Sequence, residues 1–90
     1  MTEVRREVLI TNKRGLHARA SAKFVTMAAG LPAQVEVEKD GSKVVGTSIM
    51  GLMMLGAAMG DTITISADGD GAEAAVAALA ELVEAKFGEE

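Results

Sequence analysis

The chain has 90 residues, of which 49% are hydrophobic and 24% charged, and it contains no cysteine. This balance predicts one folded domain spanning residues 1–90, and it excludes a disulfide framework, a cysteine metal site and a thiol nucleophile. The net charge of −4 argues against bulk attraction to nucleic acid or an anionic membrane surface. The N-terminus lacks the pattern of a signal peptide. The longest apolar stretch, residues 49–59, is far shorter than the ~20 residues of a spanning helix, so we expect a cytoplasmic protein without membrane insertion.

The first part of the chain predicts a strand followed by a helix. Residues 7–11 predict a strand with Val8 and Ile10 on one face, and the polar residues 12–15 form a loop that ends in glycine. From Ala18 the apolar residues recur at three- and four-residue spacing, which predicts a helix. Gly30 is its expected C-cap, and Pro32 prevents any continuation.

The middle of the chain predicts a hairpin and a short helix. Residues 34–39 alternate strictly and form the first strand of the hairpin. Asp40–Gly41 favours a type I′ turn, so residues 42–45 return as the second strand. Ser48 is a plausible N-cap for a short helix over residues 49–55.

The last part predicts a strand and a long helix. Residues 62–66 alternate with isoleucines on the inner face, and residues 68–71 form a loop. Asp70 and Glu73 have the spacing of a capping box, and a stripe of apolar residues continues the helix to about Lys86.

The order of these elements is β-α-β-β-α-β-α. Strands that are apolar on one face, with only enough helices to cover that face, predict an α+β fold. We expect a two-layer open-faced β-sandwich, in which a four-stranded antiparallel sheet is covered on one face by three helices.

His17 is the candidate reactive residue. It lies at the start of the first predicted helix, where unpaired backbone N–H groups and the helix dipole favour an anion. A phosphoryl group on its imidazole would lie near the amides of Ala18 and Ala20, and Arg19 would add a guanidinium that matches phosphate oxygens. From spacing alone, a polar junction residue beside a solvated arginine is the favoured interpretation. With no cysteine and no second histidine, we expect no metal site.

The short helix is unusually apolar. Residues 49–55 include three methionines, more apolar surface than one buried face needs, although part of it fills the core. The surplus suits an adaptable docking patch. Four basic residues are either a rim of this patch or ordinary solvated charges: Lys13, Arg14, Lys23 and Lys43.

Two motifs resemble the signatures of one protein family. Gly15-Leu16-His17-Ala18-Arg19, between a strand and a helix, looks like the active-site signature of the HPr phosphocarriers of the phosphoenolpyruvate-dependent phosphotransferase system. Thr47-Ser48-Ile49-Met50-Gly51-Leu52-Met53 resembles the family's second signature. The resemblance covers essentially the whole chain, and the two motifs come in the expected order on the expected elements.

The resemblance implies a role for each matched residue. His17 would accept a phosphoryl group on Nδ1 from phosphorylated Enzyme I and pass it to an Enzyme IIA-type protein, with Arg19 stabilising the group in both transfers. The carrier would be a monomer and a stoichiometric intermediate rather than a stand-alone catalyst, and it would need no cofactor. The family usually has proline after the arginine, whereas this chain has Ala20, which puts the phosphate geometry in doubt.

The resemblance also implies regulation and docking. The residue that matches Ser48 is phosphorylated by an HPr kinase/phosphorylase in some lineages. The family binds Enzyme I and its acceptors through the short helix beside the histidine, which implies a partner surface made of Leu16, Ile49, Met50, Leu52 and Met53.

Alternative functions stay open at this point. One is the nitrogen-related regulatory branch of the same system, which the Leu52–Leu55 stretch and the acidic Glu89–Glu90 end also resemble. Another is a serine-regulated interaction protein that carries no phosphate, but relatives of that kind lack the histidine. A small acylphosphatase-like hydrolase would need a phosphate-cradling loop and a catalytic asparagine that are not found.

Overall fold

The structure is a computed structural model that describes residues 3–89 of the chain. The elements, in order, are β1 (Glu3–Leu9), α1 (Ala18–Ala29), β2 (Gln34–Lys39), β3 (Ser42–Val45), α2 (Ile49–Met54), β4 (Thr62–Asp68), α3 (Ala72–Glu84) and a short 3-10 turn, η1 (Lys86–Gly88). None of the helices over these residues has the length and apolarity needed to cross a bilayer.

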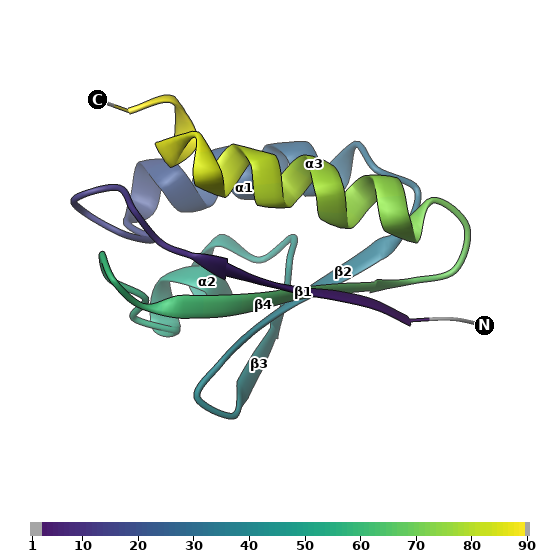
Figure 1. The fold of residues 1–90 in the computed structure, drawn as a ribbon, viewed down its shortest axis with the longest axis horizontal. Coiled ribbons are helices and arrows are strands. Elements are labelled where there is room, and N and C mark those ends of the chain that lie inside the picture. The colour runs from purple at the N-terminus through teal and green to yellow at the C-terminus, as the bar shows by residue number, and fades with distance from the viewer. Residues whose placement is uncertain (1–2, 90) are drawn as a thin grey trace.

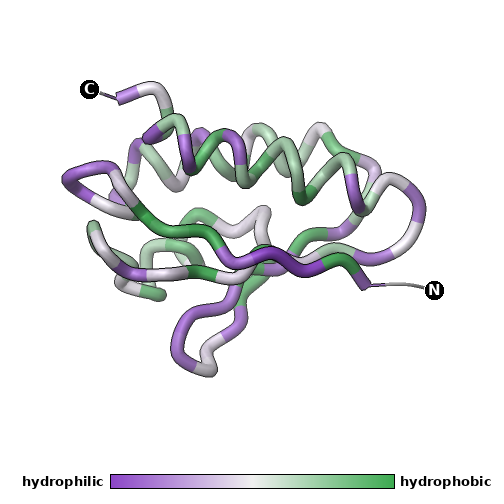
Figure 2. Tube along the Cα trace, in the orientation of Figure 1, coloured by the Kyte–Doolittle hydropathy of each residue, from purple (hydrophilic) through white to green (hydrophobic). Residues whose placement is uncertain are grey.

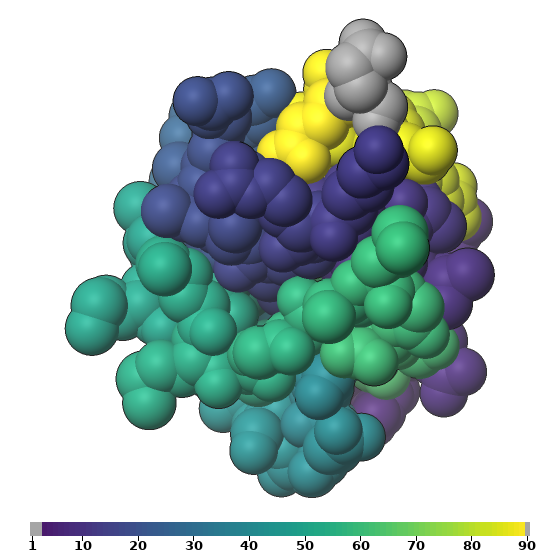
Figure 3. All heavy atoms as spheres, turned by 90° about the vertical axis from the view of Figure 1, so that its left-hand side faces the viewer, coloured from purple at the N-terminus to yellow at the C-terminus, as the bar shows by residue number. Residues whose placement is uncertain are grey.

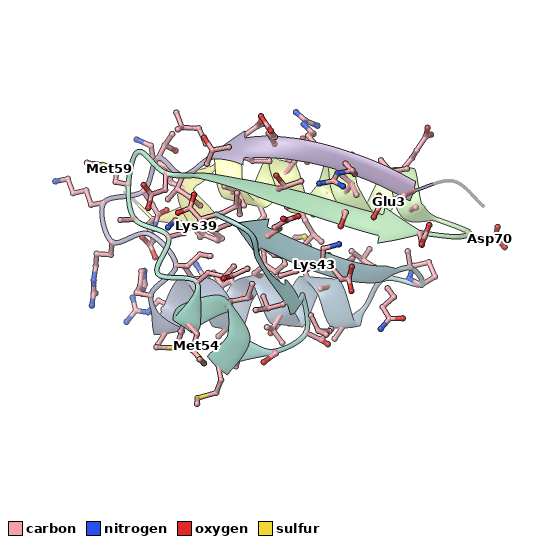
Figure 4. The ribbon with its side chains drawn as sticks, turned by 90° about the horizontal axis from the view of Figure 1, so that it is seen from below. Glu3, Lys39, Lys43, Met54, Met59 and Asp70 are labelled. Atoms are coloured by element: carbon pink, nitrogen blue, oxygen red, sulfur yellow. The ribbon has the colours of Figure 1, made fainter. Side chains whose placement is uncertain are left out.

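The strands form one antiparallel sheet with the order β1-β4-β2-β3. Helices α1 and α3 lie side by side over one face of this sheet, and α2 packs against α1 and β3 (Figure 1). The opposite face carries charged side chains such as Glu3 and Lys43 and has no helix over it (Figure 4). The predicted open-faced α+β sandwich is therefore confirmed.

The core lies between the sheet and the two long helices. Alternate strand residues point to this side because successive side chains of a strand face opposite ways, and the buried ones include Val35 and Val37 of β2. Hydrophobic segments recur along the strands and along both long helices (Figure 2). Ile63 and Ile65 of the central strand β4 are fully buried there. The only two aromatic residues of the chain, Phe24 and Phe87, are also fully buried. With so few aromatics, the core depends on close packing of small aliphatic side chains.

Two local predictions are confirmed by the backbone. Asp40 and Gly41 have φ angles of 50° and 84°, so both central residues of the hairpin turn are left-handed, as a type I′ turn requires. Ser48 is the N-cap of α2, and its Oγ accepts a hydrogen bond of 2.9 Å from the amide of Gly51.

The predicted capping box of the last helix is wrong. Gly71, not Asp70, is the N-cap of α3, and no side chain caps that end. The physical reason is the turn before the helix. Gly71 has φ +81°, a left-handed conformation that glycine adopts easily, and because of this turn the helix begins after Gly71 rather than after Asp70. A Cβ at this glycine would lie 2.9 Å from the ring of Pro32, so the position also has little room for a side chain.

The strands and the last helix differ in length from the predictions. Strand β1 covers Glu3–Leu9, so it begins and ends earlier in the chain than the predicted residues 7–11, and β4 continues beyond residue 66 to Asp68. Helix α3 ends at Glu84, because Lys86 and Phe87 have φ angles of 58° and 56°, which no right-handed helix allows.

Gly15 holds the loop before α1 against the segment before β4, and its substitution tests this contact. A Cβ at Gly15 would lie 2.2 Å from the carbonyl oxygen of Ala57, and the residue has φ +62°. We expect Gly15→Ala to lower the free energy of unfolding by at least about 3 kcal/mol, the sum of left-handed strain and overpacking. Gly41→Ala is the matched control, because Gly41 has φ +84° and open space around it, so only about 1–2 kcal/mol of strain applies. Urea denaturation measures both values, and equal losses would contradict the contact.

Candidate functional site

The candidate site lies at one end of the molecule, where the loop between β1 and α1 meets the segment before β4. The amide of Ile10 donates to Asp61 (2.8 Å), and the amide of Leu16 donates to the carbonyl of Ala57 (3.0 Å). The C-terminal residues reach the same end, and in the space-filling view they lie against this loop (Figures 1 and 3). His17 therefore lies where three distant parts of the chain converge.

His17 is the N-cap of α1, and both of its ring nitrogens have partners. The backbone is extended (φ −74°, ψ −179°), and Nδ1 accepts a 3.2 Å hydrogen bond from the amide of Arg19. Nε2 lies 2.6 Å from Oε2 of Glu89. Since an amide N–H donates and a carboxylate accepts, these partners assign the proton to Nε2 and the lone pair to Nδ1. The imidazole is held in one tautomer and one orientation.

Glu89 reaches His17 because the chain turns back after α3. Lys86 and Phe87 are left-handed, and the side chain of Phe87 is fully buried in the core. The ammonium group of Lys23 donates a 2.7 Å hydrogen bond to the carbonyl of Phe87. One apolar and one polar contact thus hold the turn that carries Glu89 to His17.

The carboxylate of Glu89 has a second partner. The side-chain amide of Asn12, which is buried, donates to Oε1 of Glu89 (3.2 Å) and to the carbonyl of Gly15 (2.8 Å). Burial from water raises the pKa of Glu89, but the hydrogen bonds from His17 and Asn12 outweigh this effect. Together with the charge of Lys23, they hold the pKa of Glu89 below its usual value of 4.5.

The lowered pKa of Glu89 predicts how this contact depends on pH. A depressed carboxyl pKa stabilises the folded state above the unfolded value of 4.5, and this stabilisation is lost as the pH falls through the lower folded pKa. We expect the ¹³C signal of the Glu89 carboxyl to titrate with a midpoint below 4.5. In His17→Ala the midpoint should move upward, because the strongest lowering partner is gone. A wild-type midpoint above 4.5, or one unchanged in His17→Ala, would contradict the contact.

The residues predicted to surround an anion lie next to His17 at the start of α1. Arg19 is exposed, and within residues 3–89 its side chain takes part in no ion pair. The amides of Ala18 and Ala20 belong to the first turn of α1, whose N–H groups have no carbonyl partner within the helix. The Ala20 side chain is fully buried, so Ala20 is available to a ligand only through its amide.

The predicted partner surface is only partly exposed. Ile49, Met50 and Met53 are exposed on α2, with Met50 at 71%. The prediction was wrong for Leu16 and Leu52, since both side chains are buried in the core and cannot contact a partner in this conformation. Leu52 lies on the inner face of α2, the face that packs against the rest of the fold, so it supplies core filling rather than docking surface.

Met54 completes the exposed surface of α2. It is 80% exposed and projects away from the fold (Figure 4). We call the exposed residues of this helix the methionine patch: Ile49, Met50, Met53 and Met54. Because α2 packs beside α1, whose N-cap is His17, the methionine patch belongs to the helical pair that bears the histidine.

Two residues of the possible basic rim have other roles. Lys43 lies on the open face of the sheet and pairs with Glu36 at 3.5 Å (Figure 4). The ammonium group of Lys23 donates its hydrogen bond to the carbonyl of Phe87. Each of these two lysines therefore already has a partner within the fold, away from the methionine patch.

Two predictions about the site remain: the role of Ser48 and the metal site. Ser48 is half-buried, and its hydroxyl oxygen is occupied as the cap of α2. Among the described residues, no group of three or more histidine, cysteine, aspartate or glutamate side chains could hold a metal ion.

Asn12, Phe87 and Glu89 are the site residues that sequence reasoning missed. Glu89 lies 72 residues from His17 in the chain, and Asn12 lies 77 residues from Glu89, so no local spacing joins them. The only available signal was Phe87, one of two aromatic residues, placed just beyond the predicted helix. An isolated aromatic residue there indicates burial but not the direction of the chain that follows.

Comparison with known proteins places the chain in a family. A family model described as "PTS HPr component phosphorylation site" matches residues 4–85. The phosphocarrier protein HPr of Cupriavidus necator is 44% identical over 86 residues, which cover 96% of this chain and 97% of that protein. The phosphocarrier protein NPr of Shewanella violacea is 43% identical over 89 residues, with 99% and 98% covered.

A solved structure agrees with these relatives. The crystal structure of HPr-C-His from Thermoanaerobacter tengcongensis matches this fold with a TM-score of 0.88, and the two sequences are 51% identical. The match covers 100% of this chain and 99% of that one. Both the sequence and the fold therefore match over nearly the full length. The chain belongs to the HPr family of phosphocarrier proteins of the phosphotransferase system.

Proposed function

We propose that His17 accepts a phosphoryl group on Nδ1 from phosphorylated Enzyme I and passes it to an Enzyme IIA-type protein. The observation that carries this proposal is the orientation of the imidazole. Its Nδ1 lone pair faces the amide of Arg19 in the first turn of α1, while Nε2 is paired with Glu89. A neutral nitrogen with an accessible lone pair is the form of histidine that acts as a nucleophile.

The start of α1 suits the group that His17 would carry. First-turn amides and the positive end of the helix dipole stabilise the negative phosphoryl oxygens. Once the Nδ1 lone pair forms a bond to phosphorus, the Arg19 amide, which donates to Nδ1 at 3.2 Å, is free to donate to a phosphoryl oxygen instead. The exposed guanidinium of Arg19 adds counter-charge, and such positioning and charge stabilisation account for most of the catalysis of phosphoryl transfer.

The methionine patch is the proposed docking surface for these partners. Its side chains are apolar and exposed beside the helix that begins at His17. Methionine adapts its shape to different neighbours, which suits a carrier that must bind a donor and several acceptors in turn.

The acceptor could also belong to the nitrogen-related branch. HPr of Cupriavidus necator and NPr of Shewanella violacea are almost equally similar to this chain, at 44% and 43% identity. A transfer assay distinguishes the two branches. The phosphorylated protein is offered separately to an Enzyme IIA of a sugar permease and to an Enzyme IIA of the nitrogen branch, and the cognate acceptor becomes labelled faster.

Phosphorylation of His17 is tested with phosphoenolpyruvate and purified Enzyme I. We expect the wild-type protein to take up one acid-labile, base-stable phosphate, because a phosphoimidazole hydrolyses in acid. His17→Ala should take up none, since the chain has no other histidine. Ser48→Ala is the control that excludes a phosphoserine and should be labelled normally. Phosphate on His17→Ala would overturn the proposal.

The role of Arg19 is tested in the same assay. Removing one preorganised charge from a developing anion typically costs about 10²-fold in rate, so we expect a loss of this order in Arg19→Ala. Arg14→Ala is the matched control, because Arg14 is also an exposed arginine and lies in the loop just before α1. Equal rates in the two variants would show that Arg19 does not act on the phosphoryl group.

Ser48 is proposed as a regulatory phosphorylation site for an HPr kinase/phosphorylase. A phosphate on its hydroxyl would lie at the start of α2 and would add negative charge next to the methionine patch, which disfavours apolar docking. With this kinase and ATP we expect an acid-stable adduct on the wild-type protein that is absent from Ser48→Ala. Thr47→Val is the control, since Thr47 is the neighbouring exposed hydroxyl and its loss should leave the adduct in place. No adduct, or one that depends on Thr47, would refute the site.

A further inference from the structure

We propose that Glu89 is a positioning residue for His17, which holds the Nε2 proton and so presents the Nδ1 lone pair to the phosphoryl group. The inference deepens the proposed function and rests on it for the phosphoryl step. The contact itself can be tested on the free protein, without a phosphoryl donor.

The contact is short and sheltered. Oε2 of Glu89 lies 2.6 Å from Nε2 of His17, and the two side chains are only 22% and 15% exposed. Hydrogen bonds that involve an ionised partner are short and stronger than neutral ones. Partial removal from water strengthens them further, which separates this pair from a solvated surface ion pair.

The chain is built to deliver Glu89 to this place. Three consecutive residues after α3 are left-handed: Lys86 (φ 58°), Phe87 (φ 56°) and Gly88 (φ 76°). A bulky residue such as Phe87 adopts this conformation only when its surroundings demand it, and such strain concentrates at functional sites. Burial of the Phe87 ring and the Lys23 hydrogen bond to the Phe87 carbonyl offset the strain. A continued helix would instead carry Glu89 away along the helix axis.

Asn12 fixes the direction of the carboxylate. Its side-chain amide bonds Oε1 of Glu89, which leaves Oε2 directed at the imidazole. Asn12 is itself held, because the same amide group bonds the carbonyl of Gly15 in the loop before His17. The carboxylate, the imidazole and the loop therefore form one connected hydrogen-bond network.

The chemistry requires a proton on Nε2 throughout the transfer. When the Nδ1 lone pair forms the bond to phosphorus, the bond between phosphorus and the donor breaks, and its electron pair stays on the donor. The ring of His17 then carries a positive charge, with the proton still on Nε2, and the carboxylate of Glu89 offsets that charge. On transfer to the acceptor the N–P bond breaks, its electron pair returns to Nδ1, and a neutral imidazole leaves.

Other sites use a carboxylate behind an imidazole in the same way. In serine hydrolases a buried aspartate fixes the tautomer and stabilises the cationic ring. Behind metal-bound histidines a carboxylate fixes the ring, and its loss typically costs 10–100-fold in affinity or activity. The Glu89–His17 geometry matches this arrangement.

The contact is tested first by NMR of the free protein. An imidazole N–H bonded to a carboxylate gives a slowly exchanging, downfield proton resonance, so we expect one for His17 Nε2–H in the wild type. Glu89→Gln should retain it at a less shifted position, because an amide oxygen still accepts, and Glu89→Ala should lose it. Glu84→Gln is the matched control, since Glu84 makes only an exposed ion pair with Arg6, and it should leave the resonance unchanged. A resonance that persists in Glu89→Ala would overturn the proposal.

Transfer kinetics then test the consequence. With Enzyme I limiting, we expect phosphate uptake by Glu89→Ala to slow about 10–100-fold, and uptake by Glu89→Gln to fall between this variant and the wild type. Glu84→Gln should match the wild type. Uptake that is unchanged in Glu89→Ala would overturn this inference alone. Failure of the wild type itself to take up phosphate would instead overturn the proposed function of His17.

Discussion

The one-sided burial of the sheet is the constraint on which the rest of the structure depends. Each strand offers one apolar face, so α1 and α3 must lie on the same side, and their ends come together at one edge. The start of α1 and the end of α3 meet there, because the two helices run in opposite directions over the sheet (Figure 1). The position of His17 and of the residues that surround it is thus a consequence of how the core is covered.

Much of this fold could be predicted from the sequence because its signals are local. Strict alternation predicted β2 as residues 34–39, and Asp40–Gly41 specified the turn through conformations that few residue types adopt easily. The N-cap role of Ser48 followed from the hydroxyl directly before an apolar helix. The capping box at Asp70 failed because a left-handed glycine overrode a side-chain pattern, and backbone geometry of that kind leaves a weaker trace in the sequence.

The site was predictable on one side of His17 only. The amides of the first turn, and Arg19, follow His17 in the chain, so spacing alone placed them near its ring. Glu89 comes from the far end of the chain through three left-handed residues, and two of these are not glycine. Their conformation depends on burial of Phe87 and on a bond from Lys23, which are tertiary effects that no local pattern encodes. Leu52 was misplaced for a related reason, since an apolar helix does not reveal which face is inner.

The two sides of the imidazole have opposite electrostatic character, and this asymmetry explains why a neutral ring suits a carrier. The Nδ1 side faces backbone amides and the positive end of α1, which favour a phosphoryl anion. The Nε2 side faces the carboxylate of Glu89, which favours a positive ring. The proposed phosphorylation of His17 would create both charges at once, an anion at Nδ1 and a cation on the ring, so each would find a complementary environment already in place. A site preorganised for both charges needs little rearrangement in either direction, as a group that must be both accepted and released requires.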